Sequence, residues 1–270
     1  MGKFDGILLA SDMDGTLLDD KREIGSATIE ALRYFTQNGG FFAIATGRTR
    51  PATEVYRAQL PCNAPGVYLN GAIICDERTQ EIVYMEGLDE RAKALAHAVM
   101  REFPHIGVEV FLLDRSYVCN MNDTSREHFL NLDIPYTQMP IDEIPEPCAQ
   151  WGKINFTGKP EQMEPVRAFV EPMKEHFNLT FSTPIFYEMT GKGGHKGDGV
   201  RRVADYLGVR PEKICTVGDS QNDLPMLQSA GISFAPANAR AETLEAADVV
   251  VRDNNHDALQ SVVEYLDQHF

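Results

Sequence analysis

Carboxylate side chains gather in two short segments that each follow an apolar run. Asp12 and Asp14 lie two residues apart behind the first run, and Asp219 and Asp223 lie four residues apart behind a later one. One carboxylate can attack a phosphoryl group and form an aspartyl-phosphate, while a second protonates the leaving oxygen and then deprotonates the hydrolytic water. Gly15 indicates a turn that lets the first pair of carboxylates take these separate positions. The two segments therefore indicate phosphoryl chemistry.

Carboxylates that share one site repel one another, and a cation relieves that repulsion. Mg²⁺ fits because it binds one or two carboxylates together with water and phosphate oxygens. The chain carries 25 Lys and Arg against 40 Asp and Glu, a net charge of −15, so an anionic substrate needs local positive groups. Lys196 and the backbone N–H groups of a helix starting near Asn222 are candidates for that role. We expect a magnesium ion and a phosphate group to share the site.

The elements that would position these residues follow an alternating order of strands and helices. Short apolar runs at 4–10, 41–45, 66–69 and 214–217 are typical of strands buried on both faces. Helical patterns between them predict a doubly wound parallel sheet, in which ligands bind outside the carboxyl ends of the strands. The polar residues that follow these strands should meet at that edge: Asp12, Asp14, Thr46, Arg48, Asn70, Asp219, Asn222 and Asp223.

The pattern changes in the middle of the chain. Hairpin strands and grouped helices there indicate an inserted α+β domain, and strands alternating with helices return afterwards. We expect residues 1–81 and 188–270 to form the two parts of a Rossmann-like α/β core. Residues 82–187 should form the inserted domain. Its two ends join the core near the predicted site, so it is expected to open and close over the cleft.

Four motifs in order resemble those of the haloacid dehalogenase superfamily. The segments that match are Asp12-Met13-Asp14-Gly15-Thr16-Leu17-Leu18, Thr46-Gly47-Arg48, Lys196-Gly197 and Gly218-Asp219-Ser220-Gln221-Asn222-Asp223. The turn at 70–72, the large insert and Asn238-Ala239 resemble the Cof-like branch, whose insert is a type IIB cap. The resemblance covers nearly the whole chain. It departs at 235–238, where Ala-Pro-Ala-Asn replaces the Gly that usually precedes the late Asn-Ala of this family.

The resemblance implies roles for individual residues. It assigns Asp12 as the nucleophile and Asp14 as the general acid and base, with Thr46 and Lys196 as further catalytic residues. The residues that would bind the phosphate or the substrate are Met13, Thr46, Gly47, Arg48, Asn70, Lys196 and Asn222. The residues that would hold Mg²⁺ or adjoin it are Asp12, Asp14, Asp219, Ser220 and Asp223. Arg48 and Asn70 have ordinary alternatives, a surface salt bridge and a turn residue.

These features favour a Mg²⁺-dependent phosphatase, a phosphoric monoester hydrolase acting on small phosphate monoesters. The family favours sugar phosphates as substrates, and the insert should select the leaving group. A phosphomutase of the phosphomannomutase type is an alternative, because it shares the core and the cap type. A catalytically inactive phosphosugar-binding protein is another. The paired carboxylates of Asp12 and Asp14 argue against this last alternative, since a pure binder has no need of both.

Composition excludes several other classes of protein. The chain is 43% hydrophobic and 24% charged, which is ordinary globular usage. Its negative charge disfavours nucleic acid and anionic membrane surfaces, and its apolar runs are far shorter than the ~20 residues of a membrane helix. Five scattered cysteines without a CxxC pair indicate reduced thiols in a cytoplasmic protein. We expect a small phosphorylated metabolite as partner; the sequence leaves the oligomeric state open, a monomer included.

Overall fold

The computed structural model describes residues 2–132 and 134–270. The helices and strands are, in chain order, β1 (Leu8–Ser11), α1 (Ser26–Gln37), β2 (Phe41–Ile44), α2 (Glu54–Arg57), β3 (Gly66–Tyr68), β4 (Ile73–Asp76), β5 (Glu81–Met85), α3 (Glu90–Glu102), β6 (Gly107–Phe111), β7 (Ser116–Asn120), α4 (Asp123–Leu132), β8 (Thr137–Gln138), β9 (Lys153–Thr157), α5 (Pro160–Val170), β10 (Phe177–Thr183), β11 (Phe186–Gly191), α6 (Lys196–Leu207), β12 (Ile214–Val217), α7 (Leu224–Gln228), β13 (Ile232–Pro236), α8 (Ala241–Ala246), β14 (Val249–Val251) and α9 (Ala258–His269).

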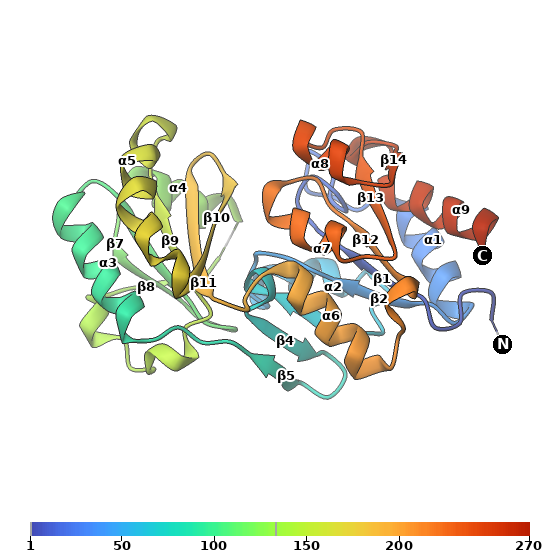
Figure 1. Cartoon of the computed structure of the whole chain (residues 1–270), viewed down its shortest axis with the longest axis horizontal. Helices are drawn as coiled ribbons and strands as arrows, with labels where there is room; N and C mark the ends of the chain where they lie inside the picture. Colours follow the sequence, from blue (N-terminus) through green and yellow to red (C-terminus); the bar gives the residue numbers. More distant parts are fainter. Residues whose placement is uncertain (1, 133) are drawn as a thin grey trace.

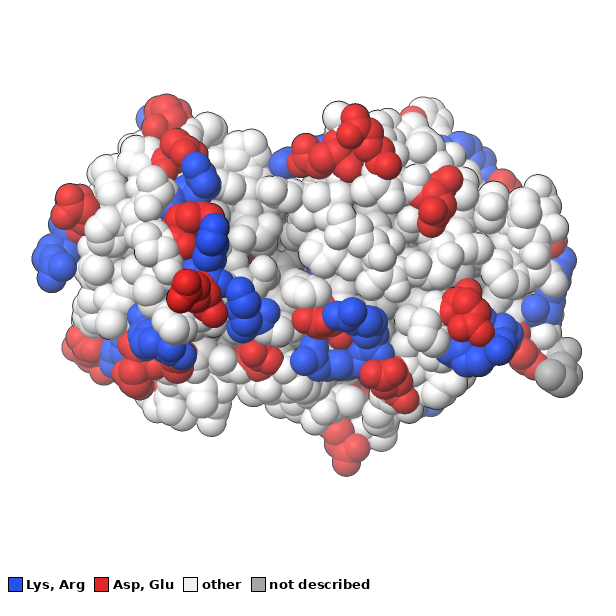
Figure 2. Space-filling view, in the orientation of Figure 1, with Lys and Arg blue, Asp and Glu red and all other residues white. Residues whose placement is uncertain are grey.

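The chain forms two lobes that lie side by side (Figure 1). The larger lobe contains both ends of the chain with β1–β5 and β12–β14, and the smaller lobe contains β6–β11 with α3, α4 and α5. Figure 2 shows a groove between the lobes on this face, with acidic and basic side chains interspersed on both. The two crossings of the chain between the lobes lie close together, between β5 and α3 and between β11 and α6.

The larger lobe is built on a sheet with the strand order β14-β13-β12-β1-β2, in which every pairing is parallel. The predicted doubly wound parallel sheet is thereby confirmed. Strand β1, which lies between β12 and β2, is buried because helices cover both faces. Leu9 packs in one cluster with residues of α1 and α9, and Leu8 and Ala10 pack in another with residues of α6. Alternation of side chains along a strand sends these neighbours to opposite faces.

The strand expected at 66–69 joins this sheet less fully than the sequence predicts. β3 touches the parallel sheet through a single parallel bridge, Ala45 to Val67, and pairs along its length with β4 in an antiparallel sheet of β3, β4 and β5. The cause is the tight turn after β3, where Leu69, Asn70 and Gly71 all have positive φ. This turn sends the chain straight back beside β3 and leaves no length for a crossover helix.

The smaller lobe is a sheet with the order β10-β11-β9-β6-β7-β8, antiparallel except for the pair β7 and β8. One of its faces is apolar and packs against α3 and α5, through residues such as Val110, Phe156 and Val166. Helix α4 is absent from the sequence-based expectation. It contributes only a short apolar stripe, and most of its residues are polar.

The expected boundaries of the insert, at 82 and 187, fall inside strands. Residue 82 lies in β5, which pairs with β4 in the larger lobe, and residue 187 lies in β11, which pairs with β9 and β10. Strand pairing therefore favours boundaries just after Met85 and Gly191.

Helix length and the state of the cysteines are two further features of the structure. Each helix in the described residues is too short or too polar to cross a membrane. The five cysteines all lie in the described part of the chain and are free thiols, three of them buried.

Candidate active site

The central strands of the larger lobe bring the two acidic segments together. Residues at the ends of β1 and β12 are direct neighbours, Ser11 opposite Val217, so the residues that follow them meet at one edge of the sheet. Carboxylate oxygens of Asp12, Asp219 and Asp223 lie within 4.8 Å of one another there. We call these three carboxylates the acidic cluster.

Lys196 lies inside the acidic cluster. Its Nζ donates to Oδ1 of Asp12 at 2.5 Å and to Oδ1 of Asp223 at 2.6 Å, and all three side chains are buried. Burial opposes the charge of this lysine, but the two carboxylates outweigh burial and raise the pKa of Lys196. Lys196 is therefore a permanent cation at the first residue of α6, as its expected role requires.

One lysine does not balance three carboxylates. Burial raises the pKa of Asp12 well above its ordinary value; Lys196 opposes this rise, and the neighbouring carboxylates of Asp223, Asp219 and Asp14 add to it. The pKa of Asp219 is also raised, first by burial and then by Asp223. The excess negative charge in this buried setting favours a bound cation.

The hydrogen bonds of the cluster distinguish which oxygens are open to a metal. Asp223 is fully engaged: Oδ1 accepts from Lys196, and Oδ2 accepts the N–H groups of Asp219 and Ser220, each at 2.9 Å. The carboxylate of Asp219 accepts the hydroxyls of Thr16 and Ser220, each at 3.0 Å, and no other hydrogen bond among residues 2–132 and 134–270. Within the described residues, Oδ2 of Asp12 receives no hydrogen bond. This set of hard oxygen donors fits Mg²⁺, with Asp12 and Asp219 better placed as ligands than Asp223.

Gly15 allows the two acidic segments to approach each other. Its φ of +79° lies in the left-handed region, and a Cβ at this position would lie 2.8 Å from Oδ2 of Asp219. Any larger residue would meet both a backbone cost and a clash with the cluster. The glycine that predicts a turn in the sequence is thus also required by the packing of the site.

Asp14 and Arg48 form a pair that the sequence does not predict. Arg48 donates to Oδ2 of Asp14 at 2.8 Å from Nε and to Oδ1 at 2.5 Å from its second terminal nitrogen. The guanidinium also donates to the carbonyl of Ala52 at 3.1 Å and lies over the ring of Tyr56. Both partners line the cavity described below, although the Asp14 side chain is 53% exposed.

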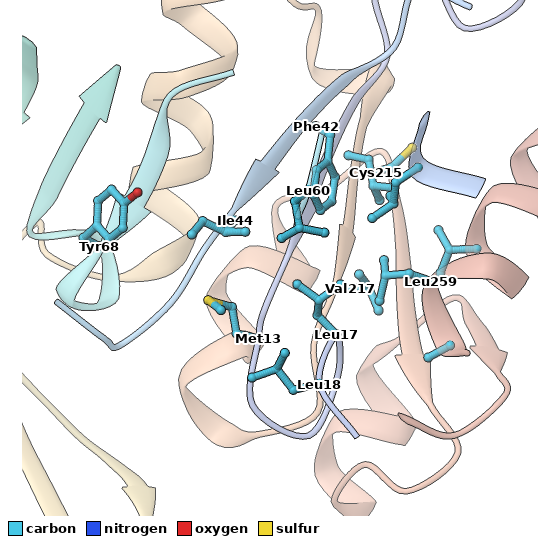
Figure 3. Packing of buried hydrophobic residues seen from close by; sticks show 14 of the residues in the cluster. Met13, Leu17, Leu18, Phe42, Ile44, Leu60, Tyr68, Cys215, Val217 and Leu259 are labelled. Carbon is cyan, nitrogen blue, oxygen red and sulfur yellow. The ribbon is translucent and has the colours of Figure 1, made fainter. Parts of the chain in front are cut away.

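Three other expected residues lie behind the site rather than in its wall. Thr46 is buried, and its Oγ1 accepts the N–H of Arg48 at 3.1 Å. Asn70 is buried and accepts from Nδ2 of Asn222 at 3.1 Å. The side chain of Met13 packs into the hydrophobic core beside Leu17 and Leu18 (Figure 3), which leaves only its backbone for a ligand.

A cavity of 570 Å³ lies between the lobes and opens onto the acidic cluster. The larger lobe contributes Asp12, Asp14, Arg22, Gly47, Arg48, Thr49, Asp219, Ser220, Asn222, Asn238 and Arg240. The smaller lobe contributes Phe111, Thr124, Glu127, His128, Asn131, Ile134, Lys153, Asn155, Ser182, Thr183, Ile185, Phe186 and Glu188. Its size is typical of sites for small molecules.

None of the cavity residues of the smaller lobe is predicted from the sequence. Two of them bind the larger lobe directly: Lys153 donates to the carbonyl of Gly47 at 2.9 Å, and Glu188 accepts from Asn70. Lys153 also pairs with Glu188 at 3.2 Å. The polar and apolar residues alternate through 153–157, a signal for one polar strand face, but this signal does not say what that face covers.

The chain is similar to known proteins along nearly its whole length. It matches the sequence profile of the haloacid dehalogenase-like hydrolases over residues 9–263. "Putative phosphatase YxeH" of Bacillus subtilis (strain 168) is 30% identical over 270 residues, covering 96% of this chain and 97% of that protein.

Solved structures share the fold. BT1666 from Bacteroides thetaiotaomicron, described among phosphatases of the haloalkanoate (HAD) enzyme superfamily, has a TM-score of 0.84 and 25% identity, covering 97% of this chain and 96% of that one. BT4131, described as a HAD subclass IIB sugar phosphatase, has a TM-score of 0.82 and 23% identity, covering 96% and 98%. The similarity therefore includes both lobes.

The uncompensated charge of the acidic cluster leads to a prediction about stability. In the presence of a chelator, Asp219→Asn should raise the melting temperature by about 2–4 °C, because it removes one of three like charges that lie close together. Mg²⁺ should stabilise the wild type by binding the native state, and this stabilisation should be largely lost in the variant. Thermal unfolding followed by circular dichroism, with and without Mg²⁺, measures both effects.

The matched control is Asp205→Asn, which removes an exposed carboxylate of α6. It should unfold like the wild type in both conditions. An Asp219→Asn variant that gains as much stability from Mg²⁺ as the wild type would show that Asp219 is not a ligand.

Proposed function

The chain belongs to the haloacid dehalogenase-like hydrolases, and on this premise we propose that it is a Mg²⁺-dependent phosphatase of small phosphate monoesters. The match over residues 9–263 confirms the resemblance that the four motifs indicate. The observation that carries the proposal is the buried Asp12, which is held at one oxygen by Lys196 and faces a cavity that Asp14 also lines. The phosphatase name of a relative with 30% identity supports the same activity.

In the proposed reaction, Oδ2 of Asp12 attacks phosphorus while the bond from phosphorus to the leaving oxygen breaks. Asp14 gives that oxygen its proton. Water then attacks the phosphorus of the aspartyl-phosphate, and Asp14 takes the proton of this water. Asp12 is restored as a carboxylate and inorganic phosphate is released.

Several residues would prepare these steps. Lys196 holds Oδ1 of Asp12 and adds positive charge where the phosphoryl oxygens bind. Arg48 donates hydrogen bonds to both oxygens of Asp14. The two side chains must therefore separate or rotate before Asp14 can reach the leaving oxygen. Gly47 and Asn222 line the cavity and offer a backbone and an amide group for the phosphate.

Asp12, Asp219 and the backbone carbonyl of Asp14 would hold Mg²⁺, with Ser220 and Asp223 beside them. The bound ion would supply positive charge that offsets the phosphoryl oxygens and the acidic cluster. The smaller lobe would act as a cap that encloses the substrate and excludes bulk water. We further infer sugar phosphates as the substrate class, and a cytoplasmic location from the five free thiols.

The experiment that tests the activity is a panel of phosphorylated metabolites, hexose 6-phosphates among them, assayed for inorganic phosphate. Free phosphate supports a phosphatase, whereas conversion to an isomeric sugar phosphate would identify a phosphomutase. Binding without either product would identify an inactive phosphosugar-binding protein.

Asp12→Asn should abolish hydrolysis while the fold is retained. The substitution keeps the shape of the side chain and removes the attacking charge, so we expect kcat to fall by about a thousandfold or more. Release of phosphate from p-nitrophenyl phosphate measures the loss, and circular dichroism checks the fold. Near-wild-type turnover in this variant would contradict the covalent mechanism.

Chelation should abolish activity, and Mg²⁺ should restore it while Ca²⁺ inhibits. Ca²⁺ accepts more ligands and looser geometry than Mg²⁺, so it can draw both oxygens of Asp12 and hinder the attack. Phosphate release after dialysis against a chelator, followed by titration with each ion, gives the result. Full activity after exhaustive chelation would rule out the metal requirement.

A further inference from the structure

The cap sheet presents a polar row to the cavity. Glu109 of β6 pairs with Asn155 of β9, and Asn155 pairs with Glu188 of β11, so the three residues lie directly opposite one another on neighbouring strands. All three are buried, with Glu109 fully and Asn155 99% removed from solvent. Their neighbours along the strands, Val110 and Ile154, point the other way into the apolar cluster under α3 and α5. Polar residues on this buried face need partners, because burial without hydrogen bonds is costly.

Glu109 fixes the orientation of two residues that line the cavity. Its Oε2 accepts from Nδ2 of Asn155 at 3.2 Å and lies 3.1 Å from Nδ1 of His128 on α4. A carboxylate only accepts hydrogen bonds, so the amide of Asn155 must turn its NH₂ group to Glu109, and His128 must carry its proton on Nδ1. The atoms left for the cavity are then Oδ1 of Asn155, which is an acceptor, and Nε2 of His128, which accepts a hydrogen bond in the neutral form of the ring.

These acceptors lack partners. Oδ1 of Asn155 and Oε1 of Glu109 are buried side-chain atoms without a hydrogen bond among residues 2–132 and 134–270. Nε2 of His128 likewise has no hydrogen bond within that part of the chain. An unpaired buried acceptor is costly, and a ligand that donates a hydrogen bond to Oδ1 of Asn155 would recover that cost. Asn155 and His128 line the same cavity as Asp12, so one ligand can contact Asp12 and these two side chains together.

The other cavity groups of the cap complete the description of that ligand. Glu188 and Lys153 neutralise each other, and Oε1 of Glu188 accepts from Ser182 at 2.7 Å. The ring of Phe186 packs on His128 with centroids 4.5 Å apart, and this ring also lines the cavity. An aromatic face beside two acceptors suits a group with an apolar C–H face and hydroxyl donors at its edge. A carboxylate or a second phosphate placed between Asn155 and His128 would instead meet two acceptors.

We propose that Asn155 and His128 form the leaving-group subsite and that they select a sugar ring by accepting hydrogen bonds from its hydroxyls. Glu109 is a positioning residue, which fixes the acceptor character of both without touching the substrate. The inference rests on the proposed phosphatase function, because the phosphoryl group must lie at Asp12. It specifies the substrate class as phosphate monoesters of neutral, hydroxyl-rich rings.

The test compares a sugar phosphate with an ester that lacks hydroxyls. Asn155→Leu removes the acceptor at similar volume, and His128→Phe removes Nε2 while keeping an aromatic ring. Each should raise KM for the best hexose 6-phosphate about tenfold or more, with kcat/KM for p-nitrophenyl phosphate changed less than about threefold. Glu109→Gln should raise the same KM while kcat is retained. The glutamine amide can donate a hydrogen bond as well as accept one, so Asn155 and His128 would no longer be held in one orientation.

Deoxy analogues of the best hexose 6-phosphate sharpen the test. The wild type should prefer the parent sugar over the analogue that lacks the contacted hydroxyl, and Asn155→Leu or His128→Phe should lose that preference. Glu161→Gln, an exposed change on α5 at the other face of the cap sheet, is the control and should behave as wild type. Unchanged KM values in the folded variants would overturn the proposal, as would equal losses on both esters or a preference for anionic leaving groups.

Binding to the Asp12→Asn protein separates this inference from the proposed activity. Calorimetry with the same hexose 6-phosphate should show that adding Asn155→Leu weakens binding about tenfold. An unchanged Kd would overturn the subsite even if hydrolysis is observed. Absence of phosphate release by the wild type from every ester, together with this loss of binding, would overturn the proposed function and leave the subsite supported.

Discussion

The contact of Lys196 with Asp12 and Asp223 is the interaction on which the rest of the site depends. A buried lysine and buried carboxylates are each costly alone, so the three side chains hold one another in place. To make this contact, the first turn of α6 must reach the ends of β1 and β12. Gly197 permits the close packing of this turn on α7, since a Cβ there would lie 2.4 Å from the carbonyl of Pro225. Asp223 then uses its second oxygen to hold the loop that presents Asp219.

The sequence predicts the meeting of Asp12 and Asp219 well, because the topology of the sheet determines where both residues lie. Strands that are parallel and adjacent must end at the same edge, so Asp12 and Asp219 meet whatever the details of packing. The pairing of Asp14 with Arg48 is different. The arginine has a long side chain that can reach several partners, and spacing along the chain does not decide between them. Asn70 and Thr46 were also found by position, yet their side chains support neighbours instead of lining the cavity.

The second lobe shows where sequence reasoning ends. Alternation along β6 and β9 reveals a polar face, but the same pattern describes any sheet with one face in water. Glu109 is covered in part by α4, whose His128 contacts it, and the placement of that helix does not follow from local sequence. Helix α4 itself has a weak apolar stripe, and it supplies His128. The boundaries of the insert depend likewise on which strands pair, since β5 and β11 both cross the positions at which composition changes.

Binding of the lobes to each other and enclosure of a ligand use the same residues. Lys153 and Glu188 line the cavity and also bind Gly47 and Asn70 across the gap, while Arg22 of the larger lobe donates to the carbonyl of Asn131. Separation of the lobes would therefore break hydrogen bonds that lie next to the phosphoryl site. In the proposed function, a substrate that fills the cavity would add contacts to both lobes and so favour the arrangement in which they meet. Closure of the lobes would also exclude water, and it would then couple recognition of the leaving group to the proposed attack by Asp12 through this one interface.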